Sequence, residues 1–186
     1  MVENLKKSLY IICYFLISSC WSQNNANDSL PVNSELNQQY LNSLRSFRGK
    51  LDKKKYKHIK ALIENELNTK ISDRKDILIN YFQKAPNCIS KRSNVEYNLT
   101  FIDNCIRISA RICKENNAVD FFVFSEDSFF KDLCKTKKQF RLDSGFFYKT
   151  IFTLHENCTA FFILKANGKF YKYYGEDYFD EVKRYL

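Results

Sequence analysis

The sequence predicts an α+β domain in which N-terminal helices pack on a largely antiparallel sheet of about five or six strands. Up to about residue 84, apolar residues recur every three to four positions, which is typical of helices. From Val95 onward the pattern changes to alternation and to β-branched and aromatic runs, which favour strands. Glycine (4) and proline (2) are scarce among the 186 residues, which excludes collagen-like, linker-like and low-complexity chains.

Three helices are expected in the first half of the chain. The first is interrupted at Gly49, and Asp52 can cap the second. Ser72 or Asp73 can cap the third, which Pro86 stops. Their inward-facing apolar residues are Leu36, Tyr40, Leu41, Leu44 and Phe47, then Tyr56, Ile59, Leu62, Ile63 and Leu67, then Ile77, Leu78, Tyr81 and Phe82.

The second half is expected to supply the strands. They are predicted over residues 106–112, 119–124, 146–154, 159–165 and 169–174. In the first of these, isoleucines and an alanine alternate with polar residues, as in a half-buried strand. Asn167-Gly168 is the strongest hairpin-turn signal in the chain. Short helices over 128–135 and 176–186 complete the domain, and we expect the helices to cover one face of the sheet.

The first segment has the features of a secretory signal peptide. Lys6 and Lys7 precede nine apolar residues, 9–17, which are too few to span a membrane. Ile17-Ser-Ser-Cys20 resembles a bacterial lipobox, in which Cys20 is lipidated and becomes the first mature residue. The alternatives are ordinary cleavage after Ser22 or Gln23, an uncleaved anchor, and no export.

The predicted organisation follows from this segment. Residues 1–22 are a signal peptide, which as a lipoprotein signal ends before Cys20. Residues 23–33 are a polar tether, and 34–186 form a single α+β domain. We expect an exported protein that is periplasmic, anchored to the outer membrane or secreted.

Export implies an oxidising compartment, in which cysteines can pair. The mature chain keeps five disulfide candidates: Cys88, Cys105, Cys113, Cys134 and Cys158. If Cys105 and Cys113 flank one regular strand, they are roughly 26 Å apart, too far to pair with each other. Each is therefore expected to pair with a different element, and the odd count leaves one thiol over.

A run of basic residues predicts an anion-binding surface. Lysines at the start of the second helix oppose its dipole, so helix stability does not explain them. The net charge of +9 favours anionic partners in general. The expected partner is an anionic membrane surface or an acidic polymer, and the plain alternative is a solvated helix face. The residues are Arg45, Arg48, Lys50, Lys53, Lys54, Lys55, Lys57 and Lys60.

Catalytic patterns are sparse. His155 precedes Cys158 by three residues, and acidic pairs occur at 126–127, 176–177 and 180–181. Zinc-type cysteine spacing, a nucleophile elbow, a phosphate-binding loop, a dinucleotide fingerprint and HExxH are all missing. We therefore expect no cofactor and no metal.

The function predicted from the sequence is binding rather than catalysis. The chain is interpreted as an exported or envelope-associated, non-enzymatic protein, with a lipid anchor if Cys20 is modified. A protein is a further candidate for the partner. One alternative is a secreted hydrolase that uses acidic residues or His155. Another is a basic nucleic-acid-binding protein, which export disfavours.

Overall fold

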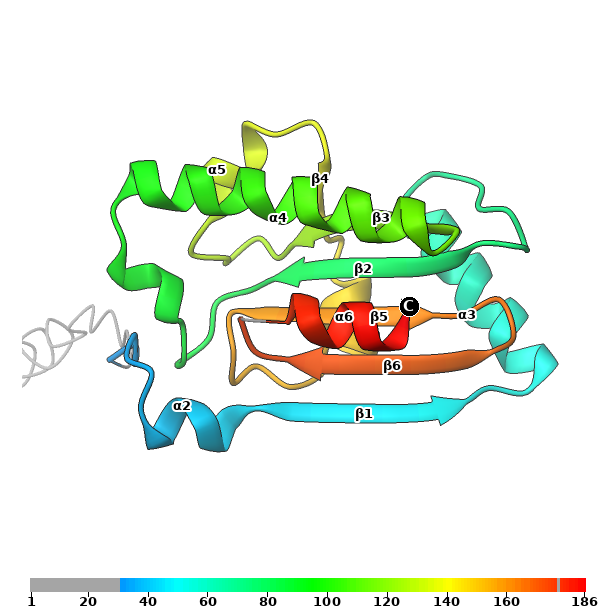
Figure 1. Ribbon diagram of the computed structural model, residues 1–186, viewed down its shortest axis with the longest axis horizontal. Coiled ribbons are helices and arrows are strands. Elements are labelled where there is room, and N and C mark those ends of the chain that lie inside the picture. Colours follow the sequence, from blue (N-terminus) through cyan, green and yellow to red (C-terminus); the bar gives the residue numbers. More distant parts are fainter. Residues whose placement is uncertain (1–30, 177) are drawn as a thin grey trace, which may run out of the picture. The chain divides into compact units, whose positions relative to one another are not determined.

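A six-stranded sheet organises the computed structural model, which describes residues 31–176 and 178–186 (Figure 1). The strand order across the sheet is β1-β6-β5-β2-β3-β4. The strands are β1 Arg45–Lys50, β2 Asp76–Phe82, β3 Ala118–Phe124, β4 Phe140–Leu142, β5 Thr159–Leu164 and β6 Lys169–Tyr174. The helical segments are α2 Gln38–Ser43, α3 Lys53–Glu66, η1 Ile89–Arg92, α4 Val95–Glu115, α5 Lys131–Lys135, η2 Phe147–Ile151 and α6 Phe179–Tyr185.

The strand pairing makes the sheet mixed. The pairs β1–β6, β6–β5 and β5–β2 are antiparallel. The pairs β2–β3 and β3–β4 are parallel. Two parallel strands need a long crossover, and α4 supplies it between β2 and β3. The α+β class with a sheet of six strands is thus as the sequence predicts.

Strand β2 is buried on both faces, which requires helices on both sides of the sheet. Ile77, Ile79 and Tyr81 pack into one core cluster with residues of α3 and η2. Leu78 and Phe82 point the other way, into clusters that include residues of α4 and α6. The expectation that the helices cover a single face is therefore wrong.

Helix α4 replaces the strand expected over 106–112. Asn94 caps it by accepting the Tyr97 N–H at 2.8 Å. The alternation in this segment does not define a buried face, because Ala110 is exposed. The buried positions instead recur at helical spacing, and α4 presents to the core Ile102, Cys105, Ser109, Ile112 and Cys113.

Three other expected elements also differ. The first helix is limited to α2, and Phe47 lies in strand β1. The segment expected to form the third helix contains strand β2 instead. A short apolar run fits a buried strand as well as a helix. The strand over 146–154 is the π-helical turn η2, where the Asp143 carboxylate accepts the Phe147 and Tyr148 N–H groups at 3.0 and 2.8 Å.

Five expectations about individual elements are confirmed. Asp52 caps α3, with its Oδ1 accepting the Lys55 N–H at 2.8 Å. Strands β3, β5 and β6 lie where the patterns placed them, and Asn167-Gly168 makes the β5–β6 turn. Gly168 has φ +83°, and a Cβ there would lie 2.9 Å from the Leu51 carbonyl oxygen. The turn therefore requires glycine.

No helix in the described part of the chain is long and apolar enough to cross a membrane.

A buried polar network joins α4 and α6 to the centre of the sheet. The Asn80 side chain is fully buried on β2. Its Nδ2 donates to Ser109 Oγ at 3.1 Å, and its Oδ1 accepts from the Tyr178 hydroxyl at 2.8 Å. Tyr178 precedes α6, so one amide links both helices to the sheet.

Removing the Tyr178 hydroxyl tests this network. Tyr178→Phe should lower the free energy of unfolding by about 1–3 kcal/mol, because it leaves the buried Asn80 oxygen without its donor. Urea denaturation measures the change. Tyr97→Phe, at an exposed tyrosine of α4, is the control and should change little. Equal midpoints for wild type and Tyr178→Phe would contradict the role given to the network.

Candidate functional site

Two hollows meet at the end of the sheet where β1 passes into α3 and where the β5–β6 hairpin turns. The Leu51 N–H donates to the Gly168 carbonyl oxygen at 2.9 Å, which holds the β1–α3 connection against the hairpin turn. Both hollows are lined by Lys50 and Asn167. The two hollows therefore adjoin each other at the β5–β6 turn.

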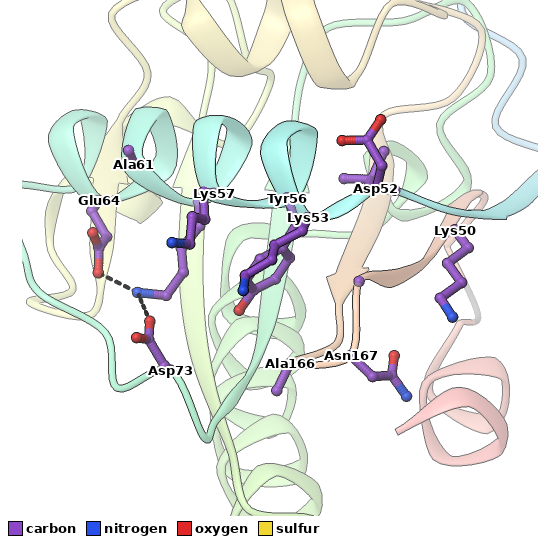
Figure 2. A pocket seen from close by; sticks show the side chains of 13 residues that line it. Lys50, Asp52, Lys53, Tyr56, Lys57, Ala61, Glu64, Asp73, Ala166 and Asn167 are labelled. Atoms are coloured by element: carbon purple, nitrogen blue, oxygen red, sulfur yellow. Dashed lines mark hydrogen bonds and ion pairs between the residues drawn. The ribbon is translucent and has the colours of Figure 1, made fainter.

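The first hollow lies between α3 and the hairpin turn and has a volume of about 690 Å³. We call it the α3 hollow. Figure 2 shows Lys50, Lys53 and Lys57 around it. Lys60 also lines this hollow and pairs with Glu64 and Asp73. Successive turns of α3 thus place lysines along one wall.

The second hollow, the α6 hollow, has a volume of about 700 Å³. Tyr171 and Tyr185 stack in its wall, with ring centroids 3.6 Å apart. Since α3 and α6 pack on opposite faces of the sheet, the two hollows flank the end of the sheet. The basic residues that line the α6 hollow are Arg48, Lys50, Lys165, Lys169 and Arg184.

Some of these cations have acidic partners. The Lys165 ammonium lies 3.0 Å from Asp76 and also donates to the main-chain oxygens of Tyr185 and Leu186. Arg184 lies 2.7 Å from Glu181. Among the described residues, 31–176 and 178–186, five cations that line the two hollows form no ion pair: Arg48, Lys50, Lys53, Lys57 and Lys169. We call these five residues, with the two hollows they line, the basic groove.

Lys60 has a structural role at the end of the α3 hollow. Its ammonium donates to Glu64 Oε1 at 2.7 Å and to the Ile71 carbonyl at 2.6 Å, and it lies 3.1 Å from Asp73. Burial by itself lowers the pKa of Lys60, but the bonds to the two carboxylates outweigh it and raise the pKa. Lys60 therefore stays charged and engaged, and it is not available to a ligand.

Tyr56 also lines the α3 hollow. Its hydroxyl is buried, with no hydrogen-bond partner among the described residues. Burial raises the pKa of this phenol, so it remains a neutral donor. Its hydrogen-bonding capacity is unused.

The predicted anion-binding residues divide into three groups. Lys50, Lys53, Lys57 and Lys60 line the α3 hollow, and Arg48 lines the α6 hollow. Three others line neither, although all are exposed: Arg45, which lies 3.7 Å from Glu156, Lys54, and Lys55, which lies 3.7 Å from Asp52.

Sequence reasoning missed the cations that come from other segments. Lys165 and Lys169 flank the hairpin turn, and Arg184 lies on α6. The Asn167-Gly168 turn signal could have placed the two lysines near each other. Nothing local could have placed this turn against the β1–α3 connection, because that contact depends on the Leu51–Gly168 hydrogen bond.

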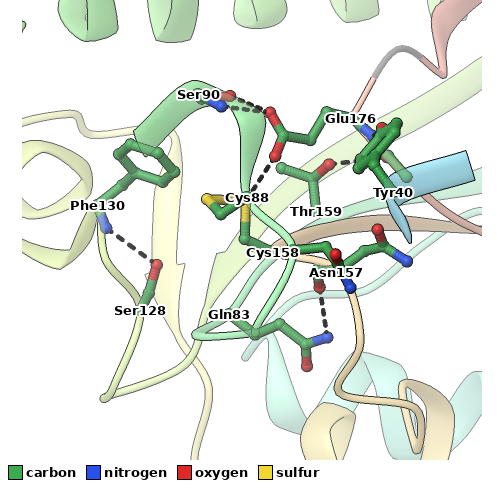
Figure 3. The surroundings of a disulfide bond; sticks show 12 residues. Tyr40, Gln83, Cys88, Ser90, Ser128, Phe130, Asn157, Cys158, Thr159 and Glu176 are labelled. Carbon is green, nitrogen blue, oxygen red and sulfur yellow. Dashed lines mark hydrogen bonds between the residues drawn. A yellow bond between two sulfur atoms is a disulfide. The ribbon is translucent and has the colours of Figure 1, made fainter. Parts of the chain in front are cut away.

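A disulfide joins Cys88 to Cys158 (Figure 3), with Cα atoms 5.2 Å apart. The expectation of at least one disulfide is confirmed. Cys105, Cys113 and Cys134 are free and buried, so the expectation that Cys105 and Cys113 each pair elsewhere is wrong. Burial raises the pKa of each free thiol to about 12. They are protonated and poor nucleophiles.

A buried carboxyl lies against this disulfide. Glu176 Oε2 accepts the Ser90 N–H at 2.8 Å and the Ser90 hydroxyl, and Oε1 lies 3.0 Å from Cys158 Sγ (Figure 3). Burial raises the pKa of Glu176. Ligand atoms of Cys88, Cys158 and Glu176 lie within 4.8 Å of one another, but the two sulfurs are bonded together and are not thiolate ligands.

The candidate catalytic groups have structural partners. His155 stacks on Tyr148 at 3.8 Å, and its Nδ1 lies 2.9 Å from Gln83 Oε1. Burial lowers the pKa of His155. Cys158 cannot act as a nucleophile beside His155 while its sulfur is bonded to Cys88.

The acidic pairs are similarly engaged. Glu126 lies 2.6 Å from Lys131, and Asp127 accepts the Ser125 hydroxyl at 2.6 Å. Asp180 and Glu181 form ion pairs within α6. Residue 177 lies outside the described residues, as do Cys20 and the whole segment 1–22.

The chain matches no protein-family model, no curated protein and no solved structure.

Removing the disulfide tests its contribution to stability. The double variant Cys88→Ala, Cys158→Ala should lose about 3–4 kcal/mol of unfolding free energy, since the bridge spans 70 residues. The double variant Cys105→Ala, Cys134→Ala, at two buried free cysteines, is the matched control because it loses two sulfurs but no crosslink. Urea midpoints measure both. An equal loss in the two proteins would show that packing alone matters.

Proposed function

We propose that this protein is an exported, non-enzymatic binding protein whose basic groove holds an acidic polymer. The observation that carries the proposal is the set of five cations that have no acidic partner among the described residues and that surround two adjoining hollows. Other cations at the same end of the sheet are ion-paired. Charge left unpaired along a hollow favours an anionic ligand.

The arrangement of the cations favours a polymer over a small anion. Lys53 and Lys57 lie on the α3 side of the sheet end, and Arg48 and Lys169 line the α6 hollow. Lys50 lines both. A single phosphate or sulfate would contact one hollow, whereas a chain of anionic groups would contact both across the hairpin turn.

A binding role is supported over catalysis by the state of the candidate catalytic groups. Cys158 is in a disulfide, and the acidic pairs in the described residues are held in ion pairs or hydrogen bonds. Export is supported by the signal-peptide features of residues 1–22 and by the disulfide, which is typical of oxidising compartments. Export also favours an envelope polymer over nucleic acid.

Charge reversal in the groove tests the binding role. The triple variant Lys50→Glu, Lys53→Glu, Lys57→Glu should bind immobilised dextran sulfate roughly tenfold more weakly or worse, because binding rests on ion release. Retention of the wild type should fall steeply with salt, as the Debye length shortens from about 10 Å at 0.1 M to about 3 Å at 1 M.

A matched control separates the groove from net charge. Arg107→Glu, Arg111→Glu, Lys114→Glu makes the same charge change on the exposed face of α4. This control should retain most of the binding, and an equal loss in both variants would contradict a groove-specific site. Vesicles rich in phosphatidylglycerol and double-stranded DNA, tested in parallel, separate a membrane surface and nucleic acid from a flexible polymer.

Mass spectrometry of the natural mature protein tests export. We expect residues 1–19 to be absent with a lipid on Cys20, or the chain to begin after Ser22 or Gln23. If Cys20 is lipidated, Cys20→Ser should move the protein from the membrane fraction to the soluble fraction. An intact mass that retains Met1 in a soluble cytoplasmic product would contradict export.

A further inference from the structure

Strand β1 ends the sheet on one side and has an open edge. In the strand order β1 is followed only by β6, and no other described strand pairs with it (Figure 1). All six of its residues are exposed. The opposite edge strand, β4, has only three residues, Phe140–Leu142. The long open edge is therefore at β1.

The register shows which main-chain groups face outward. The Leu51 N–H donates to the Gly168 carbonyl, so Leu51 faces the β6 side of the ladder. Hydrogen-bonding direction alternates along an antiparallel strand, so Phe47 and Gly49 also bond toward β6. The N–H and C=O groups of the intervening residues point away from the sheet. These residues are Ser46, Arg48 and Lys50.

This edge lacks most devices that block strand addition. It contains no proline, and six consecutive residues pair with β6 in unbroken register, without a bulge. Gly49 adds no side chain, because the Phe170 ring occupies the space where a Cβ would lie. The remaining protection is positive charge, from Arg45, Arg48 and Lys50.

Positive charge selects among the occupants of such an edge. A second copy would set Arg48 and Lys50 against the same residues of its partner, on a chain of net charge +9. An acidic segment would meet complementary charge. Arg48 and Lys50 both line the α6 hollow, so they lie on one face of β1, two residues apart. Acidic residues at every second position of an added strand would lie opposite them.

We propose that β1 takes up an extended acidic segment of a partner protein as a seventh strand of the sheet. Main-chain hydrogen bonds to Ser46, Arg48 and Lys50 would hold the segment, and its alternate carboxylates would face Arg48 and Lys50. This goes beyond polymer binding, because it requires a peptide backbone in the ligand. It shares two cations with the basic groove but does not depend on the α3 hollow.

Amide hydrogen exchange with a synthetic peptide, acetyl-(Glu-Thr)4-amide, tests the proposal on the full mature chain. At saturating peptide, exchange should slow at the outward amides of Ser46, Arg48 and Lys50. The amides of Phe47 and Gly49, already bonded to β6, should change little. Binding without this alternating protection would overturn strand addition.

A proline substitution isolates one outward N–H. Arg48→Pro and Arg48→Ala both remove the charge, but only Arg48→Pro also removes the donor, at an edge position where proline is tolerated. Arg48→Pro should bind the peptide about three- to tenfold more weakly than Arg48→Ala. Equal affinities for the two variants would overturn the proposal.

A second measurement leaves the protein unchanged, which covers the outcome that Arg48→Pro does not fold. Peptides N-methylated on all glutamates or on all threonines carry the same charge. One series should fail to bind and the other should bind, because alternate N–H groups of an added strand face β1. Equal binding of the two series would overturn the proposal.

Two further outcomes separate this proposal from the anionic-polymer function. Dextran sulfate has no amides, so it should bind without protecting Ser46, Arg48 or Lys50. If dextran sulfate does not bind but the peptide protects these amides, strand addition stands and the polymer function fails. A peptide-free protein that sediments as a dimer with these amides protected would assign the edge to a second copy and overturn the acidic partner.

Discussion

Burial of β2 on both faces is the constraint on which the rest of the structure depends. Its alternate residues enter different clusters, Ile77 and Ile79 on the α3 side and Leu78 on the α4 and α6 side. A strand of this kind needs a helix over each face. Helix α3 packs on one face of β2 and helix α6 on the other. The hollows of the basic groove lie between each helix and the sheet end.

Within that frame, ion pairing sorts the many cations into two sets. Lys60 and Lys165 are partly or wholly buried and are held by carboxylates and backbone carbonyls. Lys50, Lys53 and Lys57 are exposed and have no acidic partner in the described part of the chain. The first set stabilises the fold at the sheet end through its ion pairs, and the second set is available to bind an anionic ligand. A charge run in the sequence therefore contains two kinds of lysine that composition does not distinguish.

The sequence predicted correctly those features that depend on interactions between residues close together in the chain. The Asp52 cap, the Asn167-Gly168 turn and the aromatic run of β3 each act within a few residues, and all three lie where expected. The failures came from short segments whose pattern fits two periods. Residues 106–112 alternate, but they belong to a helix whose buried positions begin at Asn98. Residues 77–82 fit a helix stripe, but burial on both faces makes them a strand. The sequence predicted the groove cations of β1 and α3 but not Lys169, because Lys169 joins the site through a long-range backbone contact.

The disulfide divides the chain into a closed loop and the segments outside it. Residues 89–157 lie within the loop, whose neck is Cys88 and Cys158. The groove cations lie outside it, with Lys50, Lys53 and Lys57 before the neck and Lys169 after it. A proteolytic cut anywhere in 89–157 would leave two chains that the bridge still holds together. All the groove cations would then remain in one covalently linked molecule, even after a cut in the loop.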